Sequence, residues 1–264
     1  MSDHPLACSW AALRTDSRTA LIPYLTAGYP TWEVSLAALR AAAEVSDIIE
    51  VGVPFSDPLA DGPTIQRSTF EALRQGMTLP RTLALIAEAH LERPVVVFSY
   101  LNPILRYGVE RFLRDAASIG VAGLLLTDLP AGADPAVEAA VGGSPIDLIR
   151  LVAPTTRAER LRAAVQGAGG FIYLVARLGV TGASTALAAD LPGSVARLRE
   201  ATALPIAVGF GISTADQART VARIADGVVV GSALVDVLGS GGVDGAGRFL
   251  RGLREAVDTV EAVR

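Results

Sequence analysis

The sequence predicts an α/β protein and, within that class, a (β/α)8 barrel. Short, continuously apolar segments alternate with stretches of helical apolar spacing along the whole chain of 264 residues. Apolar runs without polar alternation are typical of parallel strands that are covered on both faces. Eight strand–helix units in about 250 residues are also the content of a barrel. A doubly wound open sheet is the alternative, but no GxGxxG motif follows the first predicted strand.

The predicted strands share a short apolar run. They are residues 20–25, 48–51, 95–98, 123–126, 148–152, 171–175, 206–208 and 227–230. The stretches between them have apolar residues at helical spacing, which predicts helices over residues 32–43, 78–89, 109–117, 156–166, 191–202 and 213–224. Ser213 is expected to be the N-cap of its helix, and Pro192 fits the first position of another.

The two ends of the chain are expected to complete a single domain over residues 1–264. Residues 1–19 predict a short helical segment that covers the floor of the barrel, with Trp10 and Leu13 as anchors. The run from Gly239 to Gly242 has a flexible composition. After it, residues 243–264 predict a C-terminal helix on the barrel exterior, because residues 249–260 have helical apolar spacing.

The composition limits what the protein can do. Apolar residues make up 51% and charged residues 19%, so a large core is expected and disorder is not. A net charge of −4 argues against a nucleic-acid or anionic-membrane partner. No apolar run has the length of a membrane span, and no secretory signal is visible, so a cytoplasmic protein is expected.

The missing residue types restrict the chemistry further. The sequence contains no lysine, which excludes Schiff-base catalysis on this chain. The single cysteine, Cys8, excludes an internal disulfide and a cysteine metal site. The two histidines, His4 and His90, argue against a multi-histidine metal site. Acid–base chemistry therefore depends on carboxylates, tyrosine or water.

Two carboxylates stand out between residues 50 and 66. Glu50 is at the C-terminal end of the second predicted strand, the face at which barrel active sites are built. An apolar barrel mouth would raise its pKa toward neutrality. Asp61 ends a loop that contains three prolines and two glycines between Gly52 and Pro63. The alternatives are that Glu50 only hydrogen-bonds a neighbouring strand and that Asp61 caps the helix after Pro63.

Glycine pairs after the seventh and eighth predicted strands indicate a phosphate site. Gly211 belongs to the segment 209–213, and Gly231 and Ser232 follow the last strand. Each segment leads into a helix N-terminus, and barrels commonly bind phosphate between these two loops. After the sixth strand, residues 173–185 have the composition of a mobile lid, and Gly182 could add a third contact. The alternatives are ordinary turns and an ordinary surface loop.

Aromatic residues at the same rim could form the wall of a pocket. Phe98 ends the third predicted strand and Tyr100 follows it, Tyr24 belongs to the first, and Thr127 follows the fourth. The pocket between them would have the size of an aromatic ligand. Core packing is the more frequent explanation for any single aromatic residue.

Together these segments resemble the tryptophan synthase alpha subunit. The similarity extends from residues 21–28 to Gly231-Ser232. Residues 50–66 carry it almost letter for letter, and residues 179–182 and 209–213 support it independently. The resemblance implies a (β/α)8 barrel that cleaves indole-3-glycerol phosphate to indole and glyceraldehyde 3-phosphate. That retro-aldol step needs no Schiff base or metal, in agreement with the missing lysines and the scarce histidines.

The resemblance also implies a role for each candidate residue. Glu50 would be the general acid and base, and Asp61 would accept the indole N–H and stabilise the positive charge on the protonated ring. Tyr173 would position the substrate, and Thr181 would meet Asp61 when the lid closes. The phosphate would be bound by Gly182, Gly211, Gly231 and Ser232. The indole pocket would be lined by Tyr24, Phe98, Tyr100, Thr127, Leu151 and Phe210.

The resemblance further implies a partner, a beta subunit that carries pyridoxal phosphate, in an alpha2beta2 assembly. The expected docking residues are Pro54, Asp57, Pro58 and Asn102. One departure from the family pattern is Ala176, where many relatives have serine. A stand-alone indole-3-glycerol phosphate lyase is the close alternative. A non-catalytic regulatory partner and a different barrel enzyme for small phosphates are more distant ones.

Overall fold

The computed structural model describes residues 4–176 and 190–260. Eight parallel strands form a closed barrel in sequence order, with β8 paired back to β1. The predicted (β/α)8 barrel is therefore confirmed, and the open-sheet alternative is wrong. The strands are β1 (Ala20–Thr26), β2 (Ile49–Gly52), β3 (Val95–Ser99), β4 (Val121–Leu126), β5 (Asp147–Val152), β6 (Ile172–Val175), β7 (Ile206–Gly209) and β8 (Gly227–Val230).

The strands agree with the predicted apolar segments, and their ends differ by one or two residues. Most residues in them are buried, as expected for strands with side chains in the barrel interior on one face and helices on the other. Glu50 differs from the apolar residues around it, because it is a carboxylic acid in β2 with no exposed surface.

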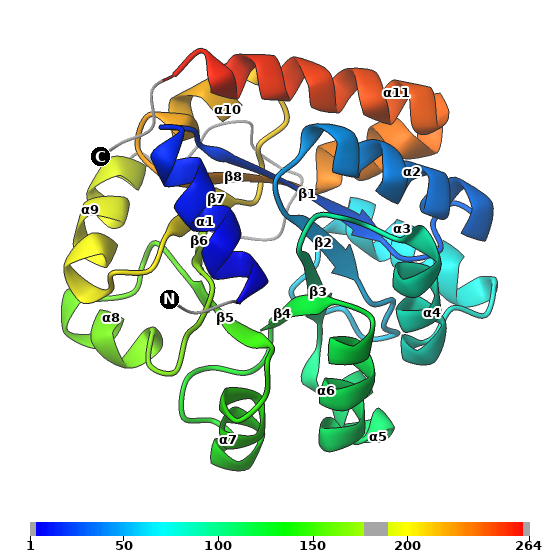
Figure 1. Cartoon of the computed structure of the whole chain (residues 1–264), viewed down its shortest axis with the longest axis horizontal. Helices are drawn as coiled ribbons and strands as arrows, with labels where there is room; N and C mark the ends of the chain where they lie inside the picture. The colour runs from blue at the N-terminus through cyan, green and yellow to red at the C-terminus, as the bar shows by residue number, and fades with distance from the viewer. Residues whose placement is uncertain (1–3, 177–189, 261–264) are drawn as a thin grey trace.

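Helices surround the barrel (Figure 1). In chain order they are α1 (Pro5–Thr15), α2 (Trp32–Val45), α3 (Pro63–Arg74), α4 (Leu79–Ala89), α5 (Leu101–Tyr107), α6 (Val109–Ser118), α7 (Pro135–Gly142), α8 (Ala158–Ala164), α9 (Leu191–Ala201), α10 (Ala215–Ala222) and α11 (Ser232–Asp258). Helices α5 and α7 were not predicted from the sequence, and α3 was considered only as the helix after Pro63 that Asp61 could cap. None of the helices in the described part of the chain is long and apolar enough to cross a membrane.

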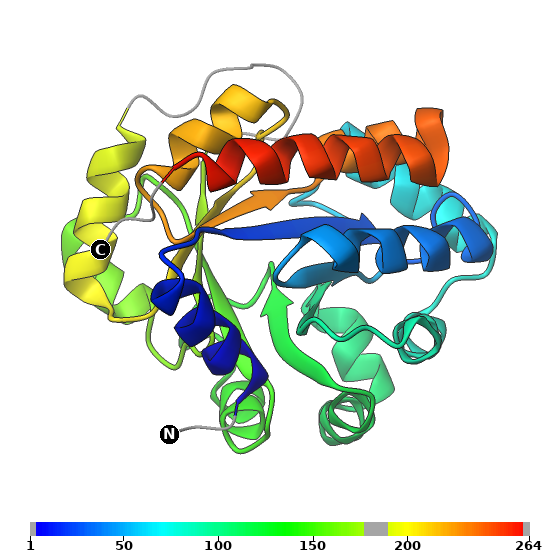
Figure 2. The same ribbon diagram turned by 45° about the horizontal axis from the view of Figure 1, so that its top comes forward.

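The C-terminal helix begins earlier in the chain than predicted. The glycine run that was expected to be flexible lies inside α11, whose backbone is helical on both sides of a kink at Gly242 (φ 60°). Glycine tolerates this positive φ, so α11 consists of two helical segments that meet at Gly242. The helix then lies beside α2 and across β1 (Figures 1 and 2). Its described part ends at Asp258.

The N-cap prediction at Ser213 is wrong by one residue. Thr214 caps α10, and its hydroxyl oxygen accepts a hydrogen bond from the backbone N–H of Gln217. The Gln217 side chain returns a bond to the backbone of Thr214, which completes a capping box. Threonine followed three residues later by glutamine is the sequence pattern that identifies this cap.

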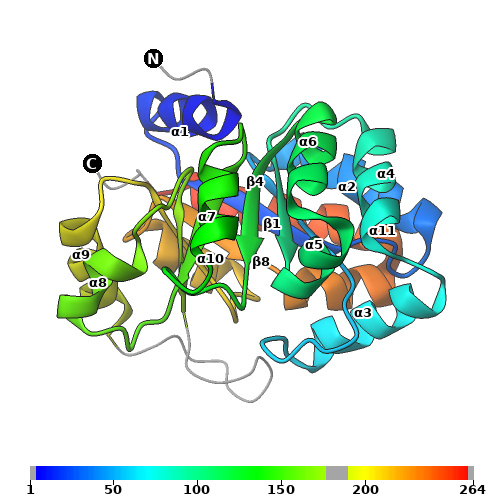
Figure 3. The ribbon, with the colours of Figure 1, turned by 90° about the horizontal axis from the view of Figure 1, so that it is seen from below.

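Helix α1 closes the floor of the barrel, as predicted. It lies at one end of the barrel, and α3 and the loop before it lie at the other (Figure 3). Leu6, Trp10 and Leu13 are its buried residues. The Trp10 ring packs edge-on against Phe171, with 5.7 Å between ring centroids. A Cβ atom on Gly227 would lie 3.0 Å from the Trp10 ring, so β8 begins with the residue that leaves room for it.

Candidate active site

Glu50 is placed by the barrel itself. It is level with Tyr24 of β1 and Val96 of β3 in the strand register. Its side chain has no exposed surface, and neither carboxyl oxygen has a hydrogen-bond partner among the described residues. Burial without a partner disfavours the charged form and raises the pKa of Glu50 from 4.5 to about 8. The alternative in which the Glu50 carboxylate only hydrogen-bonds a neighbouring strand is therefore wrong.

Asp61 approaches from the loop between β2 and α3. The loop folds back through a hydrogen bond from the Asp61 N–H to the Pro58 carbonyl oxygen (3.1 Å). The Gln66 side chain donates to the Asp61 carbonyl oxygen (2.8 Å). Burial raises the pKa of the Asp61 carboxyl group to about 6, and a hydrogen bond from Tyr100 opposes the rise. The capping alternative is wrong, because the N-cap of α3 is Gly62 and no side chain caps it.

Two tyrosine side chains at the C-terminal end of the barrel pack closely against glycines, where any larger residue would clash with them. A Cβ atom on Gly52 would lie 2.0 Å from the Tyr24 hydroxyl oxygen, and one on Gly209 would lie 2.0 Å from that of Tyr173. In each case the glycine ends the strand next to the tyrosine. Burial raises the pKa of both tyrosine hydroxyl groups above the ordinary value for tyrosine, and the nearby Glu50 adds to the rise. Both hydroxyl groups are therefore neutral donors at physiological pH.

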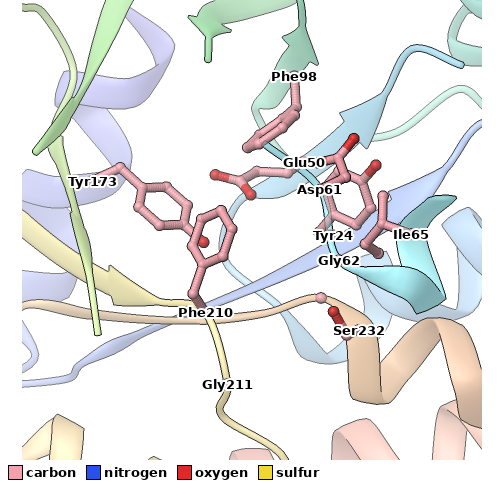
Figure 4. Close-up of a pocket in the computed structure, with 11 residues that line it drawn as sticks. Tyr24, Glu50, Asp61, Gly62, Ile65, Phe98, Tyr173, Phe210, Gly211 and Ser232 are labelled. Carbon is pink, nitrogen blue, oxygen red and sulfur yellow. The ribbon is translucent and has the colours of Figure 1, made fainter. Parts of the chain in front are cut away.

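These groups line one pocket at the C-terminal ends of the strands. About 430 Å³ of space, measured out to its open side, is free of protein atoms. In Figure 4 the Glu50 carboxyl group points into the space between Phe98 on one side and Tyr173 and Phe210 on the other. Edge-on ring contacts fix this wall, at 5.3 Å between Tyr24 and Phe98 and 5.6 Å between Tyr173 and Phe210.

The open side of the pocket has the glycine segments that were predicted to bind phosphate. Gly211, Gly231 and Ser232 all line it, and Ser232 is the first residue of α11. Gly211 has a φ of 90°, and its neighbour Phe210 has a φ of 71°, which is rare for a bulky residue. Strain of this kind is held where the surrounding structure determines it. An anion here would meet backbone N–H groups at a helix N-terminus.

The pocket contains nine of the predicted site residues and lacks three. Tyr100 bonds to the loop that carries Asp61, and the buried Thr127 hydroxyl lies beside that of Tyr100. Leu151 lines a different hollow, beside Leu129 and Arg157. Thr181 and Gly182 lie outside the described residues. The nine are Tyr24, Glu50, Asp61, Phe98, Tyr173, Phe210, Gly211, Gly231 and Ser232.

Two pocket residues were missed by the sequence analysis. Gly62 and Ile65 come from the start of α3, directly after Asp61. Pro63 followed by apolar residues at helical spacing was the available indication of that helix. Among the described residues, no three His, Cys, Asp or Glu side chains come together so that they could hold a metal ion.

The predicted docking residues lie near each other at the same end of the barrel. Pro54 and Asn102 line one surface hollow between the loop and α5. Asp57 is exposed and accepts a hydrogen bond from Ser56 (2.7 Å), and Pro58 is half-buried. Leu59 is 88% exposed, so an apolar side chain of the same loop faces outward.

The fold and the pocket define the class of protein: a (β/α)8-barrel enzyme with buried carboxylates at the C-terminal ends of its strands. A family model described as tryptophan synthase alpha chain matches residues 10–262. The chain belongs to this family, and it is a lyase of tryptophan biosynthesis.

Individual relatives agree with the family match. The tryptophan synthase alpha chain of Acidiphilium cryptum is 47% identical over 263 residues, 98% of this chain and 95% of that one. That of Gluconobacter oxydans is 48% identical over 235 residues, 88% of this chain and 87% of the other. A structure of Mycobacterium tuberculosis tryptophan synthase matches with a TM-score of 0.90 and 41% identity, covering 97% of this chain and 99% of that chain.

Proposed function

We propose that this chain cleaves indole-3-glycerol phosphate to indole and glyceraldehyde 3-phosphate, as the alpha subunit of a tryptophan synthase. The observation that carries the proposal is the buried, unpartnered carboxyl group of Glu50 in an aromatic pocket that also contains Asp61. A pKa of about 8 keeps Glu50 protonated at neutral pH, and a pKa of about 6 leaves Asp61 ionised. One group is then ready to donate a proton and the other to accept a hydrogen bond.

The reaction uses these two states in turn. Glu50 donates its proton to C3 of the indole ring, while ionised Asp61 accepts the indole N–H and stabilises the positive charge that develops. The Glu50 carboxylate then removes the hydroxyl proton from the glycerol carbon that is attached to C3. The carbon–carbon bond breaks, its electron pair returns to the ring, and indole and the aldehyde form. Glu50 ends protonated, as it began.

The other pocket residues hold the substrate in place. The rings of Tyr24, Phe98 and Phe210 pack against the indole, and the Tyr173 hydroxyl positions the glycerol group near Glu50. The phosphate binds the backbone N–H groups of Gly211 and Gly231 and the hydroxyl of Ser232, at the positive end of α11. Thr181 and Gly182, which the family resemblance adds to the substrate and phosphate sites, lie outside the described residues.

We further propose that the chain works with a tryptophan synthase beta subunit, which carries the pyridoxal phosphate, in an alpha2beta2 assembly in the cytoplasm. No cofactor is assigned to this chain. The docking residues are Pro54, Asp57, Pro58 and Asn102, at the same end of the barrel as the pocket. Solved relatives described as tryptophan synthase support a partnership of this kind.

The first experiment measures indole release from indole-3-glycerol phosphate by the chain alone and with a beta subunit. Slow release that rises sharply with the partner is expected. Fast release that the partner leaves unchanged would favour a stand-alone lyase, and no release in either case would contradict the reaction.

The Glu50→Gln variant tests the acid–base role of Glu50. Turnover should fall by at least about 100-fold while the substrate still binds. Near-normal turnover would contradict the assignment. Glu71→Gln, at a half-buried position of α3 that does not line the pocket, is the matched control and should keep full activity.

A further inference from the structure

Tyr100 has a position that the sequence did not predict. It follows β3, is the N-cap residue of α5 and is 5% exposed. Its side chain points to the catalytic loop (residues 53–62) rather than to the pocket. The hydroxyl oxygen accepts a hydrogen bond from the Ala60 N–H (2.9 Å), and the hydroxyl group also hydrogen-bonds the Asp61 carboxyl group. One atom therefore fixes the backbone before Asp61 and the side chain of Asp61 itself.

The same side chain contacts the other end of the catalytic loop. The rings of Phe55 and Tyr100 lie 5.2 Å apart, centroid to centroid, at an angle of 37°. Phe55 follows Pro54, one of the predicted docking residues. Asn102, another of them, is two residues after Tyr100 in the first turn of α5. Tyr100 thus contacts the docking side and the catalytic side of one loop.

The catalytic loop has little regular structure of its own. Its start is bound to β3 by a hydrogen bond from Val53 N–H to the Phe98 carbonyl oxygen (2.9 Å). Within it, Leu59 N–H bonds to Asp57 and Asp61 N–H bonds to Pro58. These two bonds tighten the turn but attach it to nothing outside. Contacts from neighbouring elements must therefore set the position of Asp61.

We propose that Tyr100 is a positioning residue that holds the Asp61 carboxyl group at the pocket and connects it, through Phe55, to the partner-docking side of the loop. The single hydroxyl proton is donated to Asp61, and a lone pair of the same oxygen accepts the Ala60 N–H. A residue that only filled the wall of the pocket would need the ring and not the hydroxyl. The kinetic part of this inference rests on the proposed function; the positioning part does not.

The Tyr100→Phe variant keeps the ring contact with Phe55 and removes the hydrogen bonds of the hydroxyl group with Ala60, Asp61 and Thr127. Tyr107→Phe is the matched control, because its hydroxyl also donates to a carboxylate, that of Asp115 (2.7 Å), from the end of the same helix. Carbon-13 NMR of the aspartate carboxyl groups gives the Asp61 pKa without any need for turnover, with Asp61→Asn to assign the signal. A hydrogen bond to the ionised form lowers a pKa, so Tyr100→Phe should raise that of Asp61 above about 6.

The other titratable groups that line the pocket with Asp61 are Tyr24, Glu50 and Tyr173, and Tyr100→Phe changes none of them. Tyr107→Phe should leave the Asp61 signal unmoved. An unchanged Asp61 pKa in Tyr100→Phe would overturn the positioning role, whatever the enzyme does.

Kinetics test the functional consequence. In the otherwise wild-type chain, Tyr100→Phe should lower kcat for the cleavage of indole-3-glycerol phosphate about tenfold, with a smaller effect on KM. It should also reduce the stimulation of this activity by the beta subunit. In the Asp61→Asn background the same change should have no further effect, because Tyr100 acts through Asp61. Equal losses in both backgrounds would overturn the proposal, whereas an inactive wild type would contradict the proposed function alone.

Discussion

At the scale of single residues, the site depends on two carboxyl groups whose pKa values are raised by the same cause to different extents. Glu50 has no hydrogen-bond partner in the described part of the chain, and burial alone raises its pKa to about 8. Asp61 is bonded by Tyr100, and its pKa rises only to about 6. At a pH between these two pKa values Glu50 is protonated and Asp61 is ionised, and the proposed reaction needs both of these states.

The pH dependence of kcat/KM should therefore be bell-shaped for the wild type. Activity rises with pH as Asp61 ionises near about 6 and falls as Glu50 loses its proton near about 8. The Asp61→Asn variant should lose the acid-side limb and keep the alkaline one. An acid-side limb that persists in Asp61→Asn would assign it to another group.

The raised pKa of Glu50 also predicts a cost in stability. The folded chain keeps a proton that the unfolded chain releases between pH 4.5 and about 8, so stability falls as the pH rises through this range. Glu50→Gln should remove the fall. Its free energy of unfolding should exceed that of the wild type by a few kcal/mol at about pH 9 and by little at about pH 4. Urea denaturation at both pH values measures this, and an equal difference at both would contradict it.

The phosphate assignment can be tested at Ser232 more cleanly than at the glycines. Gly211 has a φ of 90°, so a side chain there would strain the backbone whatever it did to the ligand. Ser232→Ala keeps the helix and removes one hydroxyl donor. Affinity for glycerol 3-phosphate, measured by calorimetry, should fall up to about tenfold, with indole binding unchanged.

Ser240→Ala is the matched control, because its hydroxyl bonds to Asp236 on the exposed side of the same helix. It should leave both affinities unchanged. If Ser232→Ala weakened indole and glycerol 3-phosphate equally, the phosphate site would have to lie elsewhere.

At the scale of elements, sequence patterns located the strands better than the helices. Strands such as β8 are apolar throughout because both faces are covered, and this pattern needs no knowledge of their neighbours. Helix α5 has seven residues with Pro103 inside it, and α7 runs from Pro135 to Gly142, so neither has the length that shows helical spacing. These short helices are stabilised by what they pack on, which the sequence does not state.

The candidate site shows the same limit. Glu50 and Asp61 were predicted from strand position, loop composition and family resemblance, and the structure brings both to one pocket. The function of Tyr100 was predicted as a pocket wall, because an aromatic residue at the rim gives no information on where its hydroxyl points. Its bond to Ala60 depends on a loop from a different strand–helix unit.

A buried chain of hydroxyl groups attaches α3, the helix that follows Asp61, to the barrel. The Thr26 hydroxyl bonds that of Ser68 (2.8 Å), Ser68 donates to the Ile65 carbonyl oxygen (2.9 Å), and Tyr24 hydrogen-bonds Thr26. Because Thr26 and Ser68 are 2% and 0% exposed, no water replaces a lost partner.

Ser68→Ala should therefore lower the free energy of unfolding by about 1–3 kcal/mol, because it removes the buried hydrogen bond between the Ser68 and Thr26 hydroxyl groups and leaves Thr26 with Tyr24 alone. Thr26→Val combined with Ser68→Ala removes both polar groups and should cost less than the sum of the single changes. Urea denaturation of the three variants measures this. Additive losses would show that the two hydroxyl groups do not stabilise each other.

At the scale of the whole molecule, Arg254 attaches the C-terminal helix α11 to the segments that lead into the first two strands of the barrel. This buried guanidinium donates to the Asp47 carboxylate just before β2 (2.8 Å) and to the Thr19 carbonyl oxygen just before β1 (3.0 Å). It is also paired with Asp258, one turn later in α11. Asp47 in turn accepts a bond from the Leu21 N–H (2.8 Å). The C-terminal helix, β1 and β2 are thus held at one point, opposite the active site.

Arg254→Met should destabilise the protein by about 3–5 kcal/mol, because it removes the buried guanidinium from Asp47 and leaves that carboxylate only the longer ion pair with Arg18 (3.6 Å). Arg251→Met, one turn earlier and exposed, is the matched control and should change the free energy of unfolding by less than about 0.5 kcal/mol. Adding Asp47→Asn to Arg254→Met should recover part of the loss, since the Asp47 charge that lost its buried partner is then gone. Urea denaturation decides the matter: if the double variant were less stable than Arg254→Met, the arginine would act through packing of its stem and not by neutralising Asp47.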